Sequence, residues 1–84
     1  MTKRTVTIEL ASGLEARPIA MLVQLASSYE SRIYVESDNK KVNAKSIMGM
    51  MSLSVGNGDQ VVVVTEGVDE VAAADEIETY LMAQ

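Results

Sequence analysis

Residues 61–64 read Val-Val-Val-Val, and this run decides the fold of the 84-residue chain. Four consecutive β-branched residues are apolar on both faces of an extended strand, which is typical of an interior strand of a sheet. A turn cluster at residues 56–59 (Gly-Asn-Gly-Asp) precedes the run, and Gly67 ends it. The run therefore predicts the centre of a sheet whose other strands lie elsewhere in the chain.

Strand patterns recur at three places upstream of this run. Residues 5–10 (Thr-Val-Thr-Ile-Glu-Leu) alternate polar and apolar side chains, which predicts a half-buried strand. Its buried face holds Val6, Ile8 and Leu10. Residues 32–36 form a second strand, residues 38–39 (Asp-Asn) a turn, and residues 40–43 a short basic return strand. The last two strands therefore form a hairpin.

Two helical segments lie between these strands. Residues 16–27 form the first helix after a break at residues 11–13 (Ala-Ser-Gly), and Pro18 sits in its first turn, where the missing N–H is harmless. Apolar side chains cover nearly the whole circumference of this helix, so we expect some of them at the surface. Residues 47–51 form one or two further turns, and Ser46 caps their free N–H groups.

A last helix follows Asp69, whose side chain is predicted to cap it. Its apolar stripe comprises Val71, Ala74, Ile77 and Leu81. Its acidic side chains are expected to lie mostly toward water: Glu70, Asp75, Glu76 and Glu78. The complete order, β-α-β-β-α-β-α, predicts an α+β open sandwich of four strands with helices on one face. We expect a single domain over residues 1–84.

The composition excludes several classes of function. Cysteine and histidine are both absent, which removes disulfides, thiolate metal sites and histidine-based catalysis, so we expect no metal, no cofactor and no enzymatic activity. The formal net charge of −5 argues against direct binding to nucleic acid or to anionic membranes, which need a basic surface. No apolar stretch is long enough for a signal peptide or a membrane span, so the expectation is a cytoplasmic chain with protein partners.

Two separated segments resemble the HPr family, the small phosphocarrier proteins of the sugar phosphotransferase system. Residues 13–18 (Gly-Leu-Glu-Ala-Arg-Pro) resemble its active-site loop, which reads Gly, a hydrophobic residue, His, Ala, Arg, Pro, so that Glu15 stands at the histidine position. Residues 42–53 (Val-Asn-Ala-Lys-Ser-Ile-Met-Gly-Met-Met-Ser-Leu) resemble the regulatory serine segment of HPr proteins from Gram-positive bacteria. The resemblance covers essentially the full chain and implies the HPr-like α+β open-faced sandwich, with a four-stranded antiparallel sheet and three helices on one face.

Within this family, a lost histidine and a retained serine are most similar to the catabolite repression HPr-like group, Crh, although glutamine is the usual replacement there. In the family the histidine takes phosphate from one protein and passes it to another, and a carboxylate does not replace it usefully. At a helix N-terminus, Glu15 is stabilised by the helix dipole and by Arg17 by about 0.3–1 kcal/mol. A sharper hypothesis is that its charge, held near Arg17, imitates phosphohistidine; unchanged partner affinity in Glu15→Gln would contradict it.

The resemblance also gives Ser46 a role beyond that of a plain helix cap. In Gram-positive relatives the matching serine is phosphorylated by HPr kinase/phosphorylase, a dedicated ATP-dependent kinase that also removes the phosphate. A phosphate on Ser46 would add a charge of about −1.5 to −2. Lys40, Lys41 and Lys45 are close in sequence and are either candidates to neutralise that charge or a solvated strand edge.

The resemblance further implies one docking face, because in the family the loop arginine, the serine segment and exposed apolar residues of the first helix contact partners together. The corresponding residues are Glu15, Arg17, Ala20, Lys45, Ser46, Ile47, Met48 and Met51. The last three are either core filling or an adaptable apolar patch, and the family pattern favours the patch.

The implied function is a non-catalytic regulatory adaptor in carbon catabolite repression. Phosphorylated on Ser46, it would act as corepressor for CcpA, a LacI-type regulator that itself contacts DNA. The alternative is an HPr phosphocarrier made inactive for phosphate relay by the loss of the histidine, and a third possibility is a domain that binds an unrelated metabolic enzyme. The short connection at residues 11–13 makes a strand-swapped dimer conceivable, so we expect a monomer or a weak homodimer.

Overall fold

The run of four valines lies in the interior of a sheet in a computed structural model that describes residues 1–11 and 13–83. It belongs to β4 (Gln60–Glu66), which pairs antiparallel with β1 (Thr2–Thr7) on one side and with β2 (Arg32–Ser37) on the other. β3 (Lys40–Asn43) pairs with β2 at the far edge, so the described residues form a four-stranded sheet in the order β1-β4-β2-β3. The predicted interior strand is therefore confirmed.

The β2–β3 hairpin follows the turn chemistry expected from its sequence. Asp38 and Asn39 both have φ of 47°, and Ser37 pairs directly with Lys40 across the strands. Two-residue turns of this left-handed type match the twist of the flanking strands, and Asn and Asp tolerate the backbone conformation better than most residues.

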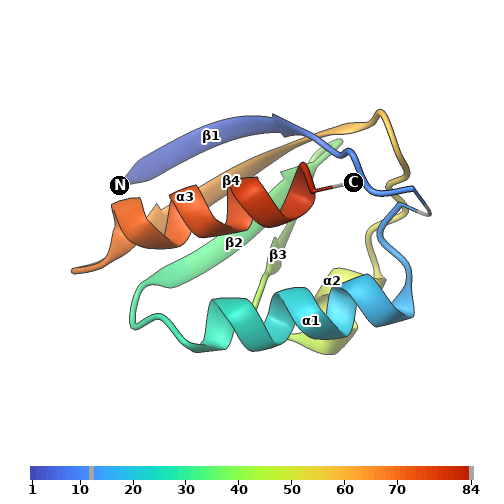
Figure 1. Ribbon diagram of the computed structural model, residues 1–84. Coiled ribbons are helices and arrows are strands. Elements are labelled where there is room, and N and C mark those ends of the chain that lie inside the picture. The colour runs from blue at the N-terminus through green and yellow to red at the C-terminus, as the bar shows by residue number, and fades with distance from the viewer. Residues whose placement is uncertain (12, 84) are drawn as a thin grey trace.

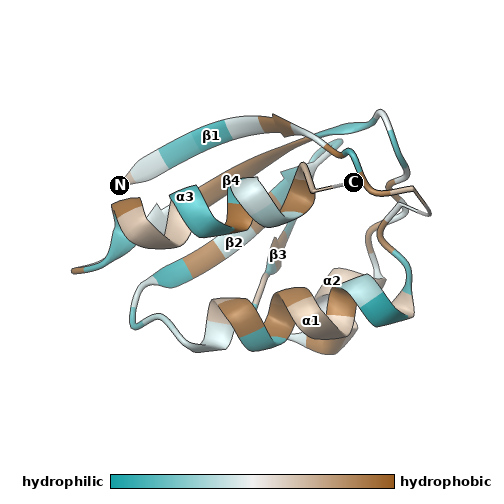
Figure 2. Cartoon of the chain, in the orientation of Figure 1, coloured by the Kyte–Doolittle hydropathy of each residue, from teal (hydrophilic) through white to brown (hydrophobic). Residues whose placement is uncertain are grey.

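Three helices cover one face of the sheet, as Figure 1 shows. They are α1 (Ala16–Ser27), α2 (Ile47–Met51) and α3 (Glu70–Leu81), and the predicted bounds of α1 agree with the structure. Figure 2 shows apolar residues along β4 and along much of α1. The α+β open-faced sandwich and its element order are confirmed. No helix among the described residues is long and apolar enough to cross a membrane.

Aliphatic side chains and Met50 build the core between the sheet and the helices. The largest fully buried members are Ile8, Leu22, Ile33, Met50, Ile77 and Leu81, each at most 1% exposed. Val64 is also buried, at 2%, although its neighbours Val63 and Thr65 occupy the helix-covered face. Its cross-strand neighbours Lys3 and Tyr34 flank it on the open face, which explains why the valine run is apolar on both sides.

The first strand begins and ends earlier than predicted. Alternation suggested residues 5–10, whereas β1 covers Thr2–Thr7, because its bounds follow the pairing of Thr2 with Thr65 through Thr7 with Gln60. Val6 and Ile8 are buried as expected, but Leu10 lies beyond the strand and is half-buried. The predicted hinge at residues 11–13 includes Ser12, which lies outside the described residues.

Two expectations for the last helix are wrong. Asp69 occupies the N-cap position of α3, but its side chain makes no cap and instead accepts hydrogen bonds from the loop between α1 and β2. Val71 is 56% exposed rather than part of the apolar stripe, which runs through Ala73, Ala74, Ile77 and Leu81. The predicted stripe is therefore correct for Ala74, Ile77 and Leu81 and wrong only for Val71, in the first turn of the helix.

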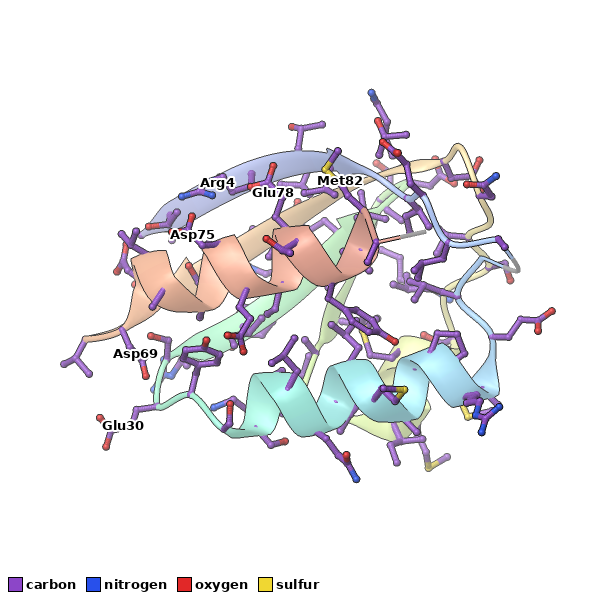
Figure 3. All side chains as sticks on the ribbon, in the orientation of Figure 1. Arg4, Glu30, Asp69, Asp75, Glu78 and Met82 are labelled. Carbon is purple, nitrogen blue, oxygen red and sulfur yellow. The ribbon has the colours of Figure 1, made fainter. Side chains whose placement is uncertain are left out.

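The acidic residues of α3 also bind β1 rather than facing only water. Glu70 accepts a hydrogen bond of 2.6 Å from the Thr2 hydroxyl and lies 2.9 Å from the N-terminal ammonium. Arg4 contacts Asp75 at 2.7 Å and Glu78 at 2.9 Å, an arrangement visible in Figure 3. These contacts fasten the N-terminal strand to the last helix.

Acid is expected to remove the stability that the contacts of Glu70 contribute. The hydrogen bond from Thr2, followed by that from the N-terminal ammonium, lowers the pKa of Glu70 to about 2 from the ordinary value of 4.5. A lowered folded-state pKa contributes stability above the unfolded-state pKa, and this contribution is lost as the pH falls from about 5 toward 2. Urea unfolding measured across this pH range should therefore show a shallower pH dependence for Glu70→Gln than for the parent chain. Equal slopes for the two proteins would contradict the assignment.

Candidate docking and phosphorylation site

The loop before α1 is held by backbone contacts to the segment that follows α2. The Gly13 N–H donates to the Leu10 carbonyl at 2.8 Å, and the Leu14 N–H donates to the Val55 carbonyl at 3.2 Å. Gly13 has φ of +69°, and a Cβ atom there would lie 2.7 Å from the Cα atom of Gly56. Glycine is thus required both by the backbone conformation and by the close approach of two chain segments.

Glu15 and Arg17 both stand exposed at the start of α1. The Glu15 carbonyl accepts the first helical hydrogen bond from the Ile19 N–H at 2.9 Å, but its side chain makes no cap. Within the described residues no ion pair joins Glu15 to Arg17. Both charges therefore point to solvent, and the structure does not show Glu15 held by Arg17.

Ser46 is the N-cap of α2, as predicted, and the residue is half-buried. The Ser46 oxygen accepts a hydrogen bond of 3.1 Å from the Gly49 N–H, while its own backbone N–H donates to the Asn43 carbonyl at 3.0 Å. A Cβ atom on Gly49 would lie 3.4 Å from the Ser46 oxygen, so glycine leaves room beside the hydroxyl. The hydroxyl oxygen lies at the start of a helix on the surface of the molecule.

The three lysines near Ser46 in sequence each have another partner. Lys45 donates from Nζ to the Tyr29 carbonyl at 2.7 Å, where it supplies a cation to the C-terminal end of α1. Lys40 donates to the Ser52 carbonyl at 3.0 Å, and Lys41 lies over the Tyr34 ring, with Nζ 4.6 Å from its centre. The three ammonium groups therefore contact other groups, although the lysines are close to Ser46 in sequence.

The apolar residues of α2 divide between core and surface. Met50 is fully buried, whereas Ile47, Met48 and Met51 are 49%, 84% and 56% exposed. Helix α2 packs beside α1, as Figure 1 shows, and Ala20 of α1 is also exposed. Exposed apolar residues therefore lie on two adjacent helices that also carry Ser46 and Arg17.

Met21, at 54% exposed, is a further surface residue that was not among the expected site residues. It follows Arg17 by four residues, and residues at this spacing share one side of a helix. The four-residue spacing from Arg17 was the only sequence feature that could have indicated Met21 as a site residue. It was not sufficient, because α1 is apolar almost all round and the sequence does not show which of its apolar side chains face outward.

The four-stranded antiparallel sheet with three helices on one face defines the chain as an HPr-like open-faced sandwich. A family model described as the PTS HPr component phosphorylation site matches residues 2–83. The chain therefore belongs to the HPr family, and the expected relationship is confirmed.

The relatives include both Crh proteins and phosphocarrier HPr proteins. The chain is 46% identical over 81 residues to the HPr-like protein Crh of Halalkalibacterium halodurans, and the aligned residues cover 96% of each chain. It is also 46% identical over 78 residues to the phosphocarrier protein HPr of Treponema pallidum, spanning 93% of this chain and 89% of the relative.

Solved structures agree with the fold. The HPr structure from Bacillus anthracis superimposes with a TM-score of 0.93 at 42% identity, over 95% of each chain. A crystal structure of Bacillus subtilis Crh, described as a dimer with a swapped domain, gives a TM-score of 0.78 at 44% identity, over 96% of this chain and 93% of that one.

Proposed function

We propose that this chain is a non-catalytic regulatory adaptor that HPr kinase/phosphorylase phosphorylates on Ser46 and that then acts as corepressor for a CcpA-type regulator. The adaptor is one HPr-like domain over residues 1–84 and acts in the cytoplasm. The regulator, and not the adaptor, contacts DNA. The observation that carries the proposal is the position of the Ser46 hydroxyl, at the N-terminal end of α2 and beside exposed Ile47 and Met48.

One further observation supports an adaptor over a phosphate carrier. Glu15 stands where the family has the histidine used for phosphate relay, and the chain contains no histidine at any position. Full-length similarity to the Crh relatives from Halalkalibacterium halodurans and Bacillus subtilis is compatible with this role but is matched by the similarity to phosphocarrier HPr proteins. Without an imidazole nucleophile, the chain retains a docking surface but not the group that carries phosphate.

Phosphorylation of Ser46 is expected to change surface charge more than conformation. The phosphate adds about −1.5 to −2 charge and remains next to backbone N–H groups at the start of α2, such as that of Gly49. Since the serine already caps the helix, the backbone has no need to refold. The modified chain thus presents a fixed anion beside an apolar surface, which is a pattern that a protein partner can read by charge and by fit.

The proposed docking face joins the start of α1 to α2. Phosphorylated Ser46 supplies the anionic contact, Arg17 a cationic one and Glu15 a second carboxylate, while the apolar contacts come from Ala20, Ile47, Met48 and Met51. Lys45 borders this face and remains bound to the Tyr29 carbonyl. Partner affinity should depend both on the phosphate and on burial of the apolar residues.

We propose that the chain is a monomer or a weak homodimer. Support for a dimer comes from the Bacillus subtilis Crh structure described as having a swapped domain, and from another described as the dimer Crh. The edge strand β1 is held to the rest by pairing with β4 and by its contacts with α3, so the monomeric arrangement is complete within one chain.

The proposed function predicts one added phosphate after incubation with HPr kinase/phosphorylase and ATP, measured by intact mass. Ser46→Ala should take up none, because the acceptor hydroxyl is gone. Ser52→Ala is the matched control, since Ser52 lies at the other end of the same helix and bonds the Gly49 carbonyl at 2.6 Å; it should accept phosphate like the parent. A parent chain that gains no phosphate would contradict the adaptor and favour the inactive phosphocarrier.

A further inference from the structure

The methionines of this chain fall into two sharply different environments. Met48 and Met51 are 84% and 56% exposed on α2, whereas Met50 on the same helix is fully buried. The two exposed residues are three positions apart, a spacing that places both on one side of a helix. The short helix thus presents two thioether sulfurs to solvent and keeps a third in the core.

Exposure decides which of these sulfurs a dissolved oxidant reaches. A thioether sulfur attacks one oxygen of hydrogen peroxide, the O–O bond breaks, and an S–O bond forms. The sulfur loses two electrons and becomes a sulfoxide, and the other peroxide oxygen leaves as water after proton transfer. The product is polar and chiral, and methionine sulfoxide reductases reverse the change.

We propose that Met48 and Met51 form a reversible oxidation site for hydrogen peroxide that controls docking at the Ser46 face. The sulfoxides introduce strong hydrogen-bond acceptors where a partner would otherwise bury apolar side chains beside Ser46 and Ile47. Burying such a group without a donor is unfavourable, so the oxidised face binds partners less tightly. The effect on docking rests on the proposed function, whereas the selective oxidation depends only on exposure.

The fold itself should survive the modification. Both side chains are outside the core, and the cap of α2 is formed by Ser46 and the Gly49 N–H rather than by a methionine. Met82 offers an internal comparison, because it is 42% exposed at the end of α3, away from α2 in Figure 3. Its oxidation has no expected consequence for the face around Ser46.

The test treats the folded chain with hydrogen peroxide and follows each methionine by peptide mass mapping. Met48 and Met51 should be oxidised at least roughly tenfold faster than Met50, since susceptibility follows exposure. The kcat/KM for phosphorylation of Ser46 by HPr kinase/phosphorylase should then fall by roughly fivefold or more, the effect of losing apolar anchors at a protein contact. Methionine sulfoxide reductases A and B together should restore it.

Two variants separate the site from general damage. Met21 is 54% exposed on the side of α1 that carries Arg17, so it is replaced by leucine in both variants to keep its oxidation out of the readout. In Met21→Leu/Met48→Leu/Met51→Leu, the ratio of treated to untreated kcat/KM should be close to one, whatever the starting value. In Met21→Leu/Met82→Leu, the ratio should fall as in the parent chain. Oxidation of Met50 as early as Met48, or an unchanged kcat/KM after both sulfoxides have formed, would overturn the inference. If the untreated chain is not phosphorylated at all, the proposed function fails and the order of oxidation alone decides the inference.

Discussion

Asp69→Ala is expected to lower the midpoint of thermal unfolding by roughly 10 °C or more. The Asp69 carboxylate accepts hydrogen bonds from the Glu30 N–H and the Ser31 N–H, both at 2.9 Å, and a further one from the Ser31 hydroxyl. Ser31 is only 1% exposed, so water has little access to its donors once the acceptor is removed. Each orphaned buried donor costs about 1–3 kcal/mol, and about 1 kcal/mol shifts the midpoint of a domain this small by about 4–8 °C.

A double-mutant cycle tests whether the effect passes through Ser31. Ser31→Ala should be destabilising in the parent chain but nearly neutral in Asp69→Ala, because the second background has already lost the shared hydrogen bond. Asp75→Ala is the matched control on the same helix. Its carboxylate is 61% exposed and pairs with Arg4 at the surface, where ion pairs contribute little. Additive effects of Asp69→Ala and Ser31→Ala would contradict the prediction.

The same contact makes a prediction about pH with a defined sign. The hydrogen bond from the Ser31 hydroxyl, followed by that from the Glu30 N–H, lowers the pKa of Asp69. Stability from a lowered pKa is present at neutral pH and is lost as the pH falls through the folded-state value. The difference in midpoint between the parent chain and Asp69→Ala should therefore narrow in acid.

The elements that could be predicted from sequence are those determined by neighbouring residues. The β-branched run of β4, the Asp38-Asn39 turn and the serine cap of α2 each depend on a few adjacent positions. The helix α1 likewise begins after a turn segment and carries Pro18 in its first turn. Local sterics and local hydrogen bonds determine these features, so sequence spacing is sufficient to find them.

The features that were mispredicted depend on partners distant in sequence. Asp69 has the residue type of a helix cap, but its acceptor oxygens bind a loop 38 residues away. The start of β1 is set by its pairing with β4. The sequence did not predict this start, because the charged residues Lys3 and Arg4 give no hydrophobic signal of a strand. Spacing rules describe one element at a time and are silent about such pairings.

The candidate site shows the same limit at the level of side chains. Resemblance indicated Ser46 and its neighbours, but composition alone left open whether the methionines of α2 are core or surface. The structure separates Met50 from Met48 by packing against distant elements. It also directs Lys45 to the Tyr29 carbonyl, a contact between segments 16 residues apart that closeness to Ser46 does not predict.

The second large effect is expected at Gly13, in the loop before α1. Gly13→Ala should lower the free energy of unfolding by roughly 2–5 kcal/mol, the sum of about 1–2 for a left-handed residue with a Cβ atom and about 1–3 for overpacking. The overpacking arises because the added carbon would lie 2.7 Å from the Cα atom of Gly56 and 3.2 Å from the Val55 carbonyl oxygen. Neither backbone atom belongs to a flexible side chain that can move aside.

Gly58→Ala provides the control that separates these two contributions. Gly58 has φ of +94°, but a Cβ atom there meets nothing within 4 Å, so this substitution has only the backbone cost. Urea unfolding should therefore show a clearly greater loss for Gly13→Ala, and equal losses would contradict the steric explanation. The greater loss would show that the close approach of Gly13 to Gly56 holds the start of α1 against the segment that follows α2.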